Sequence, residues 1–171
     1  MVRIAQFKKV SRDQFIRDWM NTFPGQTEAD ADDAYARIQL PKRATSGSAG
    51  YDFFAPLDFE LPAGANIKIP TGIRALIDEG WVLTLYPRSG LGFKYRFQLD
   101  NSVGVIDSDY ACSDNEGHIF LRMTNDSREG KGLRGPCGSA FAQGVFLPFG
   151  ITVDDDAQGI RNGGFGSTSR V

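Results

Sequence analysis

The fold is decided by two neighbouring runs, ANIKIPTGIRALI at residues 65–77 and WVLTLYP at residues 81–87, in which apolar side chains recur at nearly every second position. A period of two is typical of a β-strand with one buried face. The pattern continues outward in YDFFAPLDFEL (51–61), YRFQL (95–99), SVGVID (102–107), HIFLRMT (118–124) and AFAQGVFLPFGI (140–151). Gly or Pro lies between or beside most of these runs. The sequence therefore predicts an all-β barrel or jelly roll of short strands.

The N-terminal part changes period. Residues Val2 to Val10 predict a first strand, and residues 11–37 predict a helical insertion within a single domain of residues 1–171. Ser11 and Gln14 form a capping-box pair at the start of the first helix. The acidic segment Glu28 to Arg37 predicts a second helix. An aromatic face recurs every four residues on the first helix and indicates packing on the barrel or on a neighbouring subunit; its members are Phe15, Trp19 and Phe23.

Composition excludes several classes of protein. Nineteen basic and 21 acidic residues give a net charge of −2, which argues against a binder of nucleic-acid polymers. No run is long enough to span a bilayer, and no apolar signal segment follows Met1. The two cysteines, Cys112 and Cys137, form no metal-ligand spacing, which is consistent with a reducing cytoplasm. His118 is the one histidine, so no histidine-based triad exists, and we expect it to be a structural strand residue.

The stretch NSVGVIDSDY, residues Asn101 to Tyr110, delivers the carboxylate of Asp107 from an apolar strand. A rigid strand end can hold such a group within hydrogen-bond reach of a water, as a general base requires. A strand running into a turn explains the same residues equally well, because Asp and Ser are ordinary turn residues.

Three further segments carry polar groups suited to phosphate. PRSG at residues 87–90 presents Arg88 and Ser89 beside a glycine after an apolar strand. ATSGSAGYD (44–52) is a small-residue loop that ends in Asp52, and GGFGSTS (163–169) holds a phenylalanine in a glycine-rich tail.

Residues 159–171 lack the apolar surface to order themselves and predict a flexible C-terminal lid. Residues Asn125 to Ser139 predict a loop, because their apolar content is low.

The order of five segments, ATSGSAGYD, PRSG, NSVGVIDSDY, AFAQ and GGFGSTS, resembles that of the trimeric dUTPase family. The resemblance covers the chain from about Ile38 to the C-terminus and implies the dUTPase-like jelly-roll barrel, or β-clip, with the helical insertion outside the common core. It implies hydrolysis of dUTP to dUMP and pyrophosphate, which limits uracil incorporation into DNA. It also implies a homotrimer with active sites between subunits.

The resemblance assigns a role to each matching position. Asp107 would activate the water that attacks the alpha phosphorus and would contact the sugar 3'-hydroxyl. Tyr110 would lie against the deoxyribose and exclude UTP, provided that the chain bends at Ser108 and Asp109, since period two otherwise separates the two side chains. The hairpin around Gly104, with Asn101 nearby, would read uracil. Phosphate contacts are implied for Arg88, Ser89, Gly90, Gln143 and Arg161, and the closing tail is implied for Phe165, Gly166, Ser167 and Thr168.

The cofactor that the resemblance implies is Mg²⁺, held mainly by the substrate triphosphate, with Asp52 touching its water shell. Mg²⁺ keeps several waters and needs few protein ligands. Two positions depart from the family pattern. Ala140 stands where many members carry an arginine, and Arg161 lies one residue closer to Phe165 than is common. The continuation ACSDNEGHI after Tyr110 predicts an extra loop beside the site.

Two alternatives remain open on the sequence. A dCTP deaminase, or a bifunctional deaminase and dUTPase, would use the same barrel but a glutamate base on a following strand. A dUTPase-like regulator would use the helical insertion to bind a protein partner. Exposure of the Phe15, Trp19 and Phe23 face would favour the regulator, because a solvent-facing aromatic patch marks a binding surface.

Overall fold

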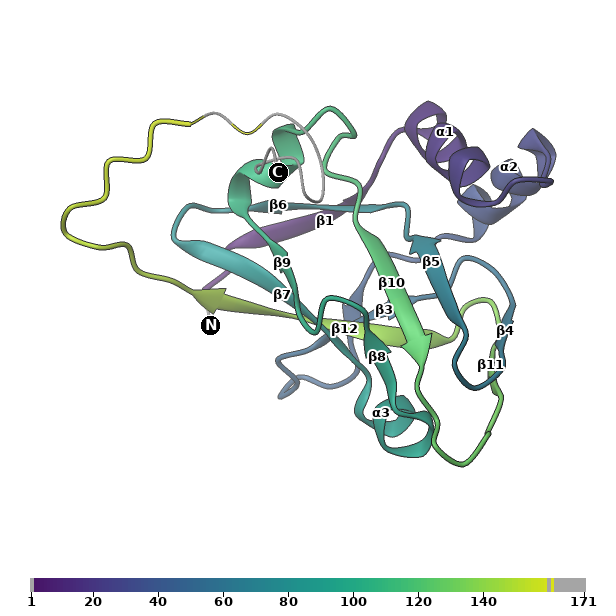
Figure 1. Cartoon of the computed structure of the whole chain (residues 1–171). Helices are drawn as coiled ribbons and strands as arrows, with labels where there is room; N and C mark the ends of the chain where they lie inside the picture. The colour runs from purple at the N-terminus through teal and green to yellow at the C-terminus, as the bar shows by residue number, and fades with distance from the viewer. Residues whose placement is uncertain (1, 160, 162–171) are drawn as a thin grey trace.

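The computed structural model describes residues 2–159 and 161, and Figure 1 shows short strands wrapped around a common core. The strands are β1 (Ala5–Lys9), β2 (Lys42–Arg43), β3 (Tyr51–Phe54), β4 (Phe59–Leu61), β5 (Asn66–Pro70), β6 (Ile73–Ile77), β7 (Trp81–Pro87), β8 (Phe97–Leu99), β9 (Gly104–Ile106), β10 (Phe120–Asn125), β11 (Leu133–Gly135) and β12 (Ala140–Pro148). The helices are α1 (Arg12–Thr22), α2 (Glu28–Arg37), α3 (Ser89–Tyr95) and the 3₁₀ turn η1 (Ser108–Cys112).

The largest sheet has the strand order β2-β3-β12-β7-β9, and its paired strands run antiparallel. Three smaller sheets, β5-β10-β8, β1-β6 and β11-β4, complete the structure. Strand β12 pairs with β7 along its length and with β3 on its other edge, so it joins segments that are far apart in the sequence (Figure 1). The all-β prediction is confirmed.

The core lies between the sheets. Buried residues alternate with less buried ones along β10, as the period of two predicts, whereas β7 buries three consecutive residues, Leu83, Thr84 and Leu85. The largest fully buried side chains include Phe53, Leu83, Leu85, Phe97, Ile106, Leu121 and Phe141. Removal of this apolar surface from water contributes most to the stability of the fold.

Helices α1 and α2 pack into the same core through the aromatic face of α1. Phe15 and Trp19 are buried, and Phe23 is half-buried against Trp19, with ring centroids 4.8 Å apart. The face is therefore covered, which removes the observation that would have favoured a protein-binding regulator. Helix α2 has the predicted bounds, and a capping box between Thr27 and Asp30 starts it.

Four local predictions need correction. The Ser11 side chain caps α1 by accepting from the Gln14 N–H, but the Gln14 amide turns away to Asp18, so only half of the capping box forms. Tyr95, the first residue of the run predicted as a strand at 95–99, instead ends helix α3, whose two glycines weaken the helical signal. Strand β11 lies inside the loop expected at residues 125–139, because buried Leu133 is too isolated to show a period. His118 precedes β10 and is not a strand residue.

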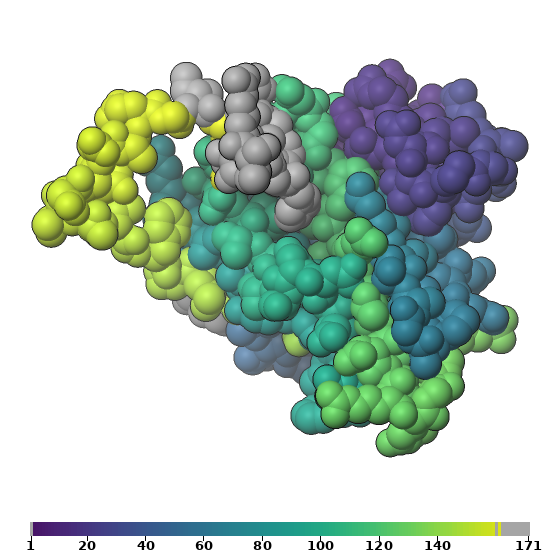
Figure 2. All heavy atoms as spheres, in the orientation of Figure 1, coloured from purple at the N-terminus to yellow at the C-terminus, as the bar shows by residue number. Residues whose placement is uncertain are grey.

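The segment after β12 leaves the body of the protein. Residues 149–159 are all exposed, and Figure 2 shows them projecting as an arm from one side. Three large apolar side chains lie on this arm in the open: Phe149, Ile151 and Val153. Among residues 2–159 and 161, no helix is both long and apolar enough to cross a bilayer.

Candidate active site

Three of the predicted phosphate-site residues meet at the end of β7 that leads into α3. The Asp52 carboxylate accepts an ion-paired contact from the Arg88 guanidinium, with Nε and Oδ1 3.2 Å apart. Asp52 lies directly across the ladder from Gln143, because β3 and β12 are neighbours. Ser89 follows Arg88 with its side chain exposed at the start of α3. A guanidinium, a hydroxyl and an amide thus surround one point on the surface.

The amide of Gln143 is held in place from two sides. Its Nε2 donates to the carbonyl of Pro87 at 3.1 Å. Gly50 leaves the space that the Gln143 Oε1 occupies, since a Cβ at residue 50 would lie 2.7 Å from that oxygen. A glycine at position 50 therefore allows the close approach of this amide.

The other candidate residues lie along β9, which pairs with β7. Gly104 faces Leu85 and Ile106 faces Leu83 across this ladder. A Cβ on Gly104 would stand 3.0 Å from the Leu85 Cβ, so a glycine lets the two strands approach. Asn101 is exposed in the turn that precedes β9. Asp107 follows directly on Ile106, and 46% of its side chain is exposed.

The chain bends at Ser108 and Asp109, as it must if the side chains of Asp107 and Tyr110 are to line one pocket. Residues Ser108–Cys112 form the 3₁₀ turn η1, with Asp107 as its N-terminal flanking residue and the Tyr110 N–H donating to the Asp107 carbonyl at 3.1 Å. The Tyr110 side chain is only 3% exposed. Its hydroxyl donates to the His118 carbonyl at 2.9 Å, and burial raises its pKa, so the group remains a protonated donor at neutral pH.

The two groups of candidate residues lie at opposite ends of β7. Asp107 follows the partner of Leu83, whereas Arg88 and Ser89 follow Pro87, which lies four residues further along β7. Four strand residues span about 13 Å, before the additional residues to Ser89 are counted. Figure 1 shows η1 and α3 at opposite ends of the molecule. One chain therefore does not bring Asp107 and Ser89 to the same substrate.

Known proteins share both the motifs and the fold. The dUTPase family model matches residues 36–168. A relative from Lactococcus lactis subsp. lactis (strain IL1403), named deoxyuridine 5'-triphosphate nucleotidohydrolase, is 44% identical over 136 residues, which cover 78% of this chain and 89% of that protein. This chain belongs to the dUTPase family.

Solved dUTPase structures agree with this membership. The dUTPase from Streptococcus mutans is 42% identical and superposes with a TM-score of 0.60, covering 70% of this chain and 91% of that one. Staphylococcus bacteriophage 80alpha dUTPase with dUPNHPP is 19% identical, with a TM-score of 0.64 over 92% of this chain and 90% of the other. At that identity, the second likeness shows the fold alone.

Arg161 lies among the acidic residues of η1. Its guanidinium donates to Asp107 and, at 2.8 Å, to Asp109, and it sits 5.8 Å from the centroid of the Tyr110 ring. Arg161 was expected to contact the gamma phosphate. In this chain of the dUTPase family it lies beside Asp107, the predicted base. The predicted tail residues Phe165, Gly166, Ser167 and Thr168 lie outside the described residues. Ala140 carries no polar side chain, and the ladder of β12 with β3 shifts register beside it.

Metal-ligating side chains do not cluster in the described part of the chain, where no group of three or more could hold an ion. Asp52 offers a single carboxylate whose side chain is largely buried and already faces Arg88. That donor set fits an outer, water-mediated contact to a Mg²⁺ carried by a triphosphate, because one carboxylate cannot form a protein cage.

Several residues around Tyr110 were missed by sequence reasoning. His118 is fully buried and bonds to Asp18 of α1, and Glu116 bonds to Ser11 at the start of the same helix. The lone histidine, immediately before an apolar run, was the one available signal. Asp18, which bonds to His118, and Ser11, which bonds to Glu116, each lie about a hundred residues from their partner in sequence, so these pairings could not be read from spacing.

Proposed function

We propose that this protein hydrolyses dUTP to dUMP and pyrophosphate at sites assembled between subunits. The observation that carries the proposal is the meeting of Asp52, Arg88 and Gln143 beside the Ser89 hydroxyl in a chain of the dUTPase family. Such a group can bind a polyphosphate and stabilise the charge that develops on a leaving group.

Asp107 acts as the general base in this reaction. Its carboxylate orients a water, accepts one of its protons, and the resulting hydroxide attacks the alpha phosphorus. The bond from that phosphorus to the bridging oxygen breaks, and pyrophosphate leaves with the electron pair. The Ser89 hydroxyl and the Arg88 guanidinium stabilise this oxygen as its charge grows. The Gln143 amide and Gly90 hold the phosphates in line for the attack.

Selectivity for base and sugar belongs to the β9 region. The hairpin from Asn101 to Gly104 reads the uracil edge through backbone groups and leaves no room for a thymine methyl. Tyr110 packs on the deoxyribose, where its ring excludes a 2'-hydroxyl. The supporting geometry is the η1 turn, which brings Tyr110 back toward the side of Asp107. Phe165 and residues 166–168 close over the base and gamma phosphate as a lid.

The assembly is a homotrimer in which one subunit contributes the Arg88 region and another contributes Asp107. The distance along β7 between these regions supports a composite site. Exposed apolar residues on and beside β9, at the end of β12 and on the arm supply surface that a monomer would leave in water; they are Val103, Val105, Leu147, Phe149, Ile151 and Val153.

Mg²⁺ bound to the substrate triphosphate would neutralise phosphate charge and polarise the reacting phosphoryl group. Asp52 would contact its waters. Release of Arg161 from Asp107 would accompany binding, because the guanidinium would then contact the gamma phosphate. The activity would serve to limit uracil incorporation into DNA, in the cytoplasm.

The test is pyrophosphate release from dUTP, dCTP, dTTP and UTP, each measured with Mg²⁺ and with a chelator. We expect release from dUTP, with little from the other three, and a strong decrease when Mg²⁺ is chelated. Ammonia release from dCTP would instead identify a deaminase of the same fold. Equal hydrolysis of all four nucleotides would contradict the proposed selectivity.

A further inference from the structure

The segment from Ser113 to His118 joins the η1 turn to helix α1. On the side of the turn, two of its residues hold the Tyr110 hydroxyl. The His118 carbonyl accepts from it at 2.9 Å, and the Asn115 Nδ2 donates to it at 3.1 Å. The Tyr110 hydroxyl therefore both donates and accepts, and both partners come from this one segment.

On the side of the helix, the His118 ring is fixed at both nitrogens. Nε2 accepts from the Gly72 N–H at 2.8 Å, which places the ring proton on Nδ1. Nδ1 then donates to the Asp18 carboxylate of α1 at 2.6 Å. The Asp18 side chain is itself held by the Gln14 amide at 2.9 Å, so one turn of α1 fixes the imidazole.

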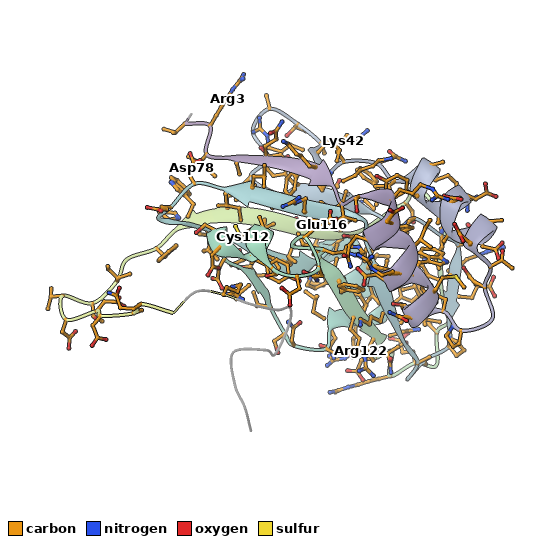
Figure 3. All side chains as sticks on the ribbon, turned by 90° about the horizontal axis from the view of Figure 1, so that it is seen from above. Arg3, Lys42, Asp78, Cys112, Glu116 and Arg122 are labelled. Atoms are coloured by element: carbon orange, nitrogen blue, oxygen red, sulfur yellow. The ribbon has the colours of Figure 1, made fainter. Side chains whose placement is uncertain are left out.

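A second attachment lies at the start of the helix. Glu116 accepts from the Ser11 N–H at 2.7 Å and from the Ser11 hydroxyl at 2.6 Å. Figure 3, seen from above, places Glu116 beside α1. Burial alone would raise the Glu116 pKa, but these two hydrogen bonds outweigh it and the pKa is lowered, so Glu116 is a carboxylate at neutral pH.

The backbone between the two attachments has little freedom. Glu116 and Gly117 adopt positive φ angles of 59° and 73°. A Cβ on Gly117 would stand 2.6 Å from the Ala111 Cα and 2.8 Å from the Tyr110 carbonyl oxygen. The segment thus packs on the backbone of η1, so it links α1 to the turn that carries Tyr110.

We infer that Asp18, Glu116 and His118 are positioning residues for sugar recognition, through which helix α1 sets the place of the Tyr110 ring. The inference rests on the proposed function. Exclusion of a 2'-hydroxyl is a matter of less than an ångström, so the site needs a ring that is held from behind as well as packed at its face. The helical insertion acts on substrate choice without touching the substrate.

The test compares kcat/KM for dUTP with kcat/KM for UTP in the full-length protein. In Asp18→Ala, loss of the imidazole's partner lets Tyr110 move, and we expect the dUTP-to-UTP ratio to fall about 10-fold. Asp18→Asn keeps an oxygen that can accept from Nδ1 and should retain most of the ratio. The matched control is Asp32→Ala, which removes an ion pair between α1 and α2 but none of the hydrogen bonds of Asp18, Glu116 or His118.

A double-mutant cycle makes the test specific. Tyr110→Phe removes the hydroxyl that bonds to His118 and should lower the ratio as Asp18→Ala does. If α1 acts through this hydroxyl, Asp18→Ala should cause little further change in the Tyr110→Phe background. Additive effects would show that Asp18 does not act through Tyr110 and would overturn the inference.

A variant that loses activity because it does not fold must be recognised separately. Circular dichroism identifies a variant that does not fold, and in that event Asn115→Ala, which removes a bond to Tyr110 and leaves the α1 contacts in place, takes the same ratio test. If kcat/KM fell equally for dUTP and UTP, their ratio would be unchanged. That result would mean that these residues have a purely structural role and would overturn the inference. Selective dUTP hydrolysis by the wild-type protein in the same assay keeps the proposed function intact even then.

Discussion

Asp107 gains its importance from its place at a strand end and not from a buried environment. Its carboxylate is about half exposed in the single chain, so this chain alone does not shield it from water. The charges around it are Asp109 and Arg161, which bonds to both acids. In the proposed homotrimer, a neighbouring subunit would complete the surroundings of this carboxylate.

The substitution Asp107→Asn tests the role of this carboxylate. The amide keeps the shape of the side chain but cannot accept a proton, so we expect dUTP turnover to fall about 10³-fold while nucleotide binding persists. Turnover is measured by pyrophosphate release and binding by calorimetry with a non-hydrolysable dUTP analogue. Turnover near that of the wild-type protein would assign the base to another group.

The substitution Gly50→Ala tests whether the position of the Gln143 amide matters for phosphate binding. A Cβ in Gly50→Ala would displace the Gln143 amide from its position, and we expect KM for dUTP to rise about 10-fold through a lost phosphate contact. Gly47→Ala is the matched control, because nothing lies within 4 Å of a Cβ there. Equal KM values in the two variants would show that the position of this amide does not matter.

At the scale of the element, local pattern predicted some segments well and others poorly. Helix α2 has the bounds that were predicted from its acidic segment, because composition over such a short range is a local signal. Helix α3 was missed, since glycines at positions 90 and 92 weaken the signal for one short helix. The pairing of β9 with β7, which separates Asp107 from Ser89, depends on contacts between distant segments and could not be read from periodicity.

Acid should loosen α1 from the η1 region. Burial raises the Asp18 pKa, but the bonds from His118 and Gln14 outweigh it, and the pKa ends below 3.8; that of Glu116 ends below 4.5. Both contributions to stability are therefore complete above these values and are lost as pH falls through the lower folded-state pKa values. Asp18→Asn should flatten the acid side of a denaturation series between about pH 2 and 4. A slope identical to that of the wild-type protein would contradict this account.

Deletion of residues 164–171 tests the lid. The buried hydrophobic residues of the described chain all lie between Val10 and Ala142, so the fold should melt at an unchanged temperature. We expect turnover to be lost and the affinity for a triphosphate analogue to fall, with dUMP binding less affected. A large drop in melting temperature or loss of assembly would make the tail structural.

At the scale of the whole molecule, the residues of the proposed site are divided between two regions of the single chain. Arg88, Ser89 and Gln143 lie at one end of β7 and Asp107 lies toward the other, and the arm leaves apolar side chains in water. The proposed homotrimer would bring the two regions of different subunits together and could cover the arm.

The arm offers a direct test of assembly. Ile151→Asp places a charge on a side chain that is exposed in the single chain, so the subunit fold should be unaffected. If the arm packs on another subunit, light scattering should show a smaller species, and dUTP hydrolysis should fall with it. An intact trimer with this variant would place the interface elsewhere.

The composite site is tested most directly by mixing two inactive variants, Asp107→Asn and Ser89→Ala, under conditions that exchange subunits. If Asp107 and Ser89 come from different subunits, a quarter of the sites in an equal mixture are intact, and we predict that about a quarter of wild-type dUTP hydrolysis returns. Activity no greater than the average of the separate variants would place both residues in one chain and contradict the account.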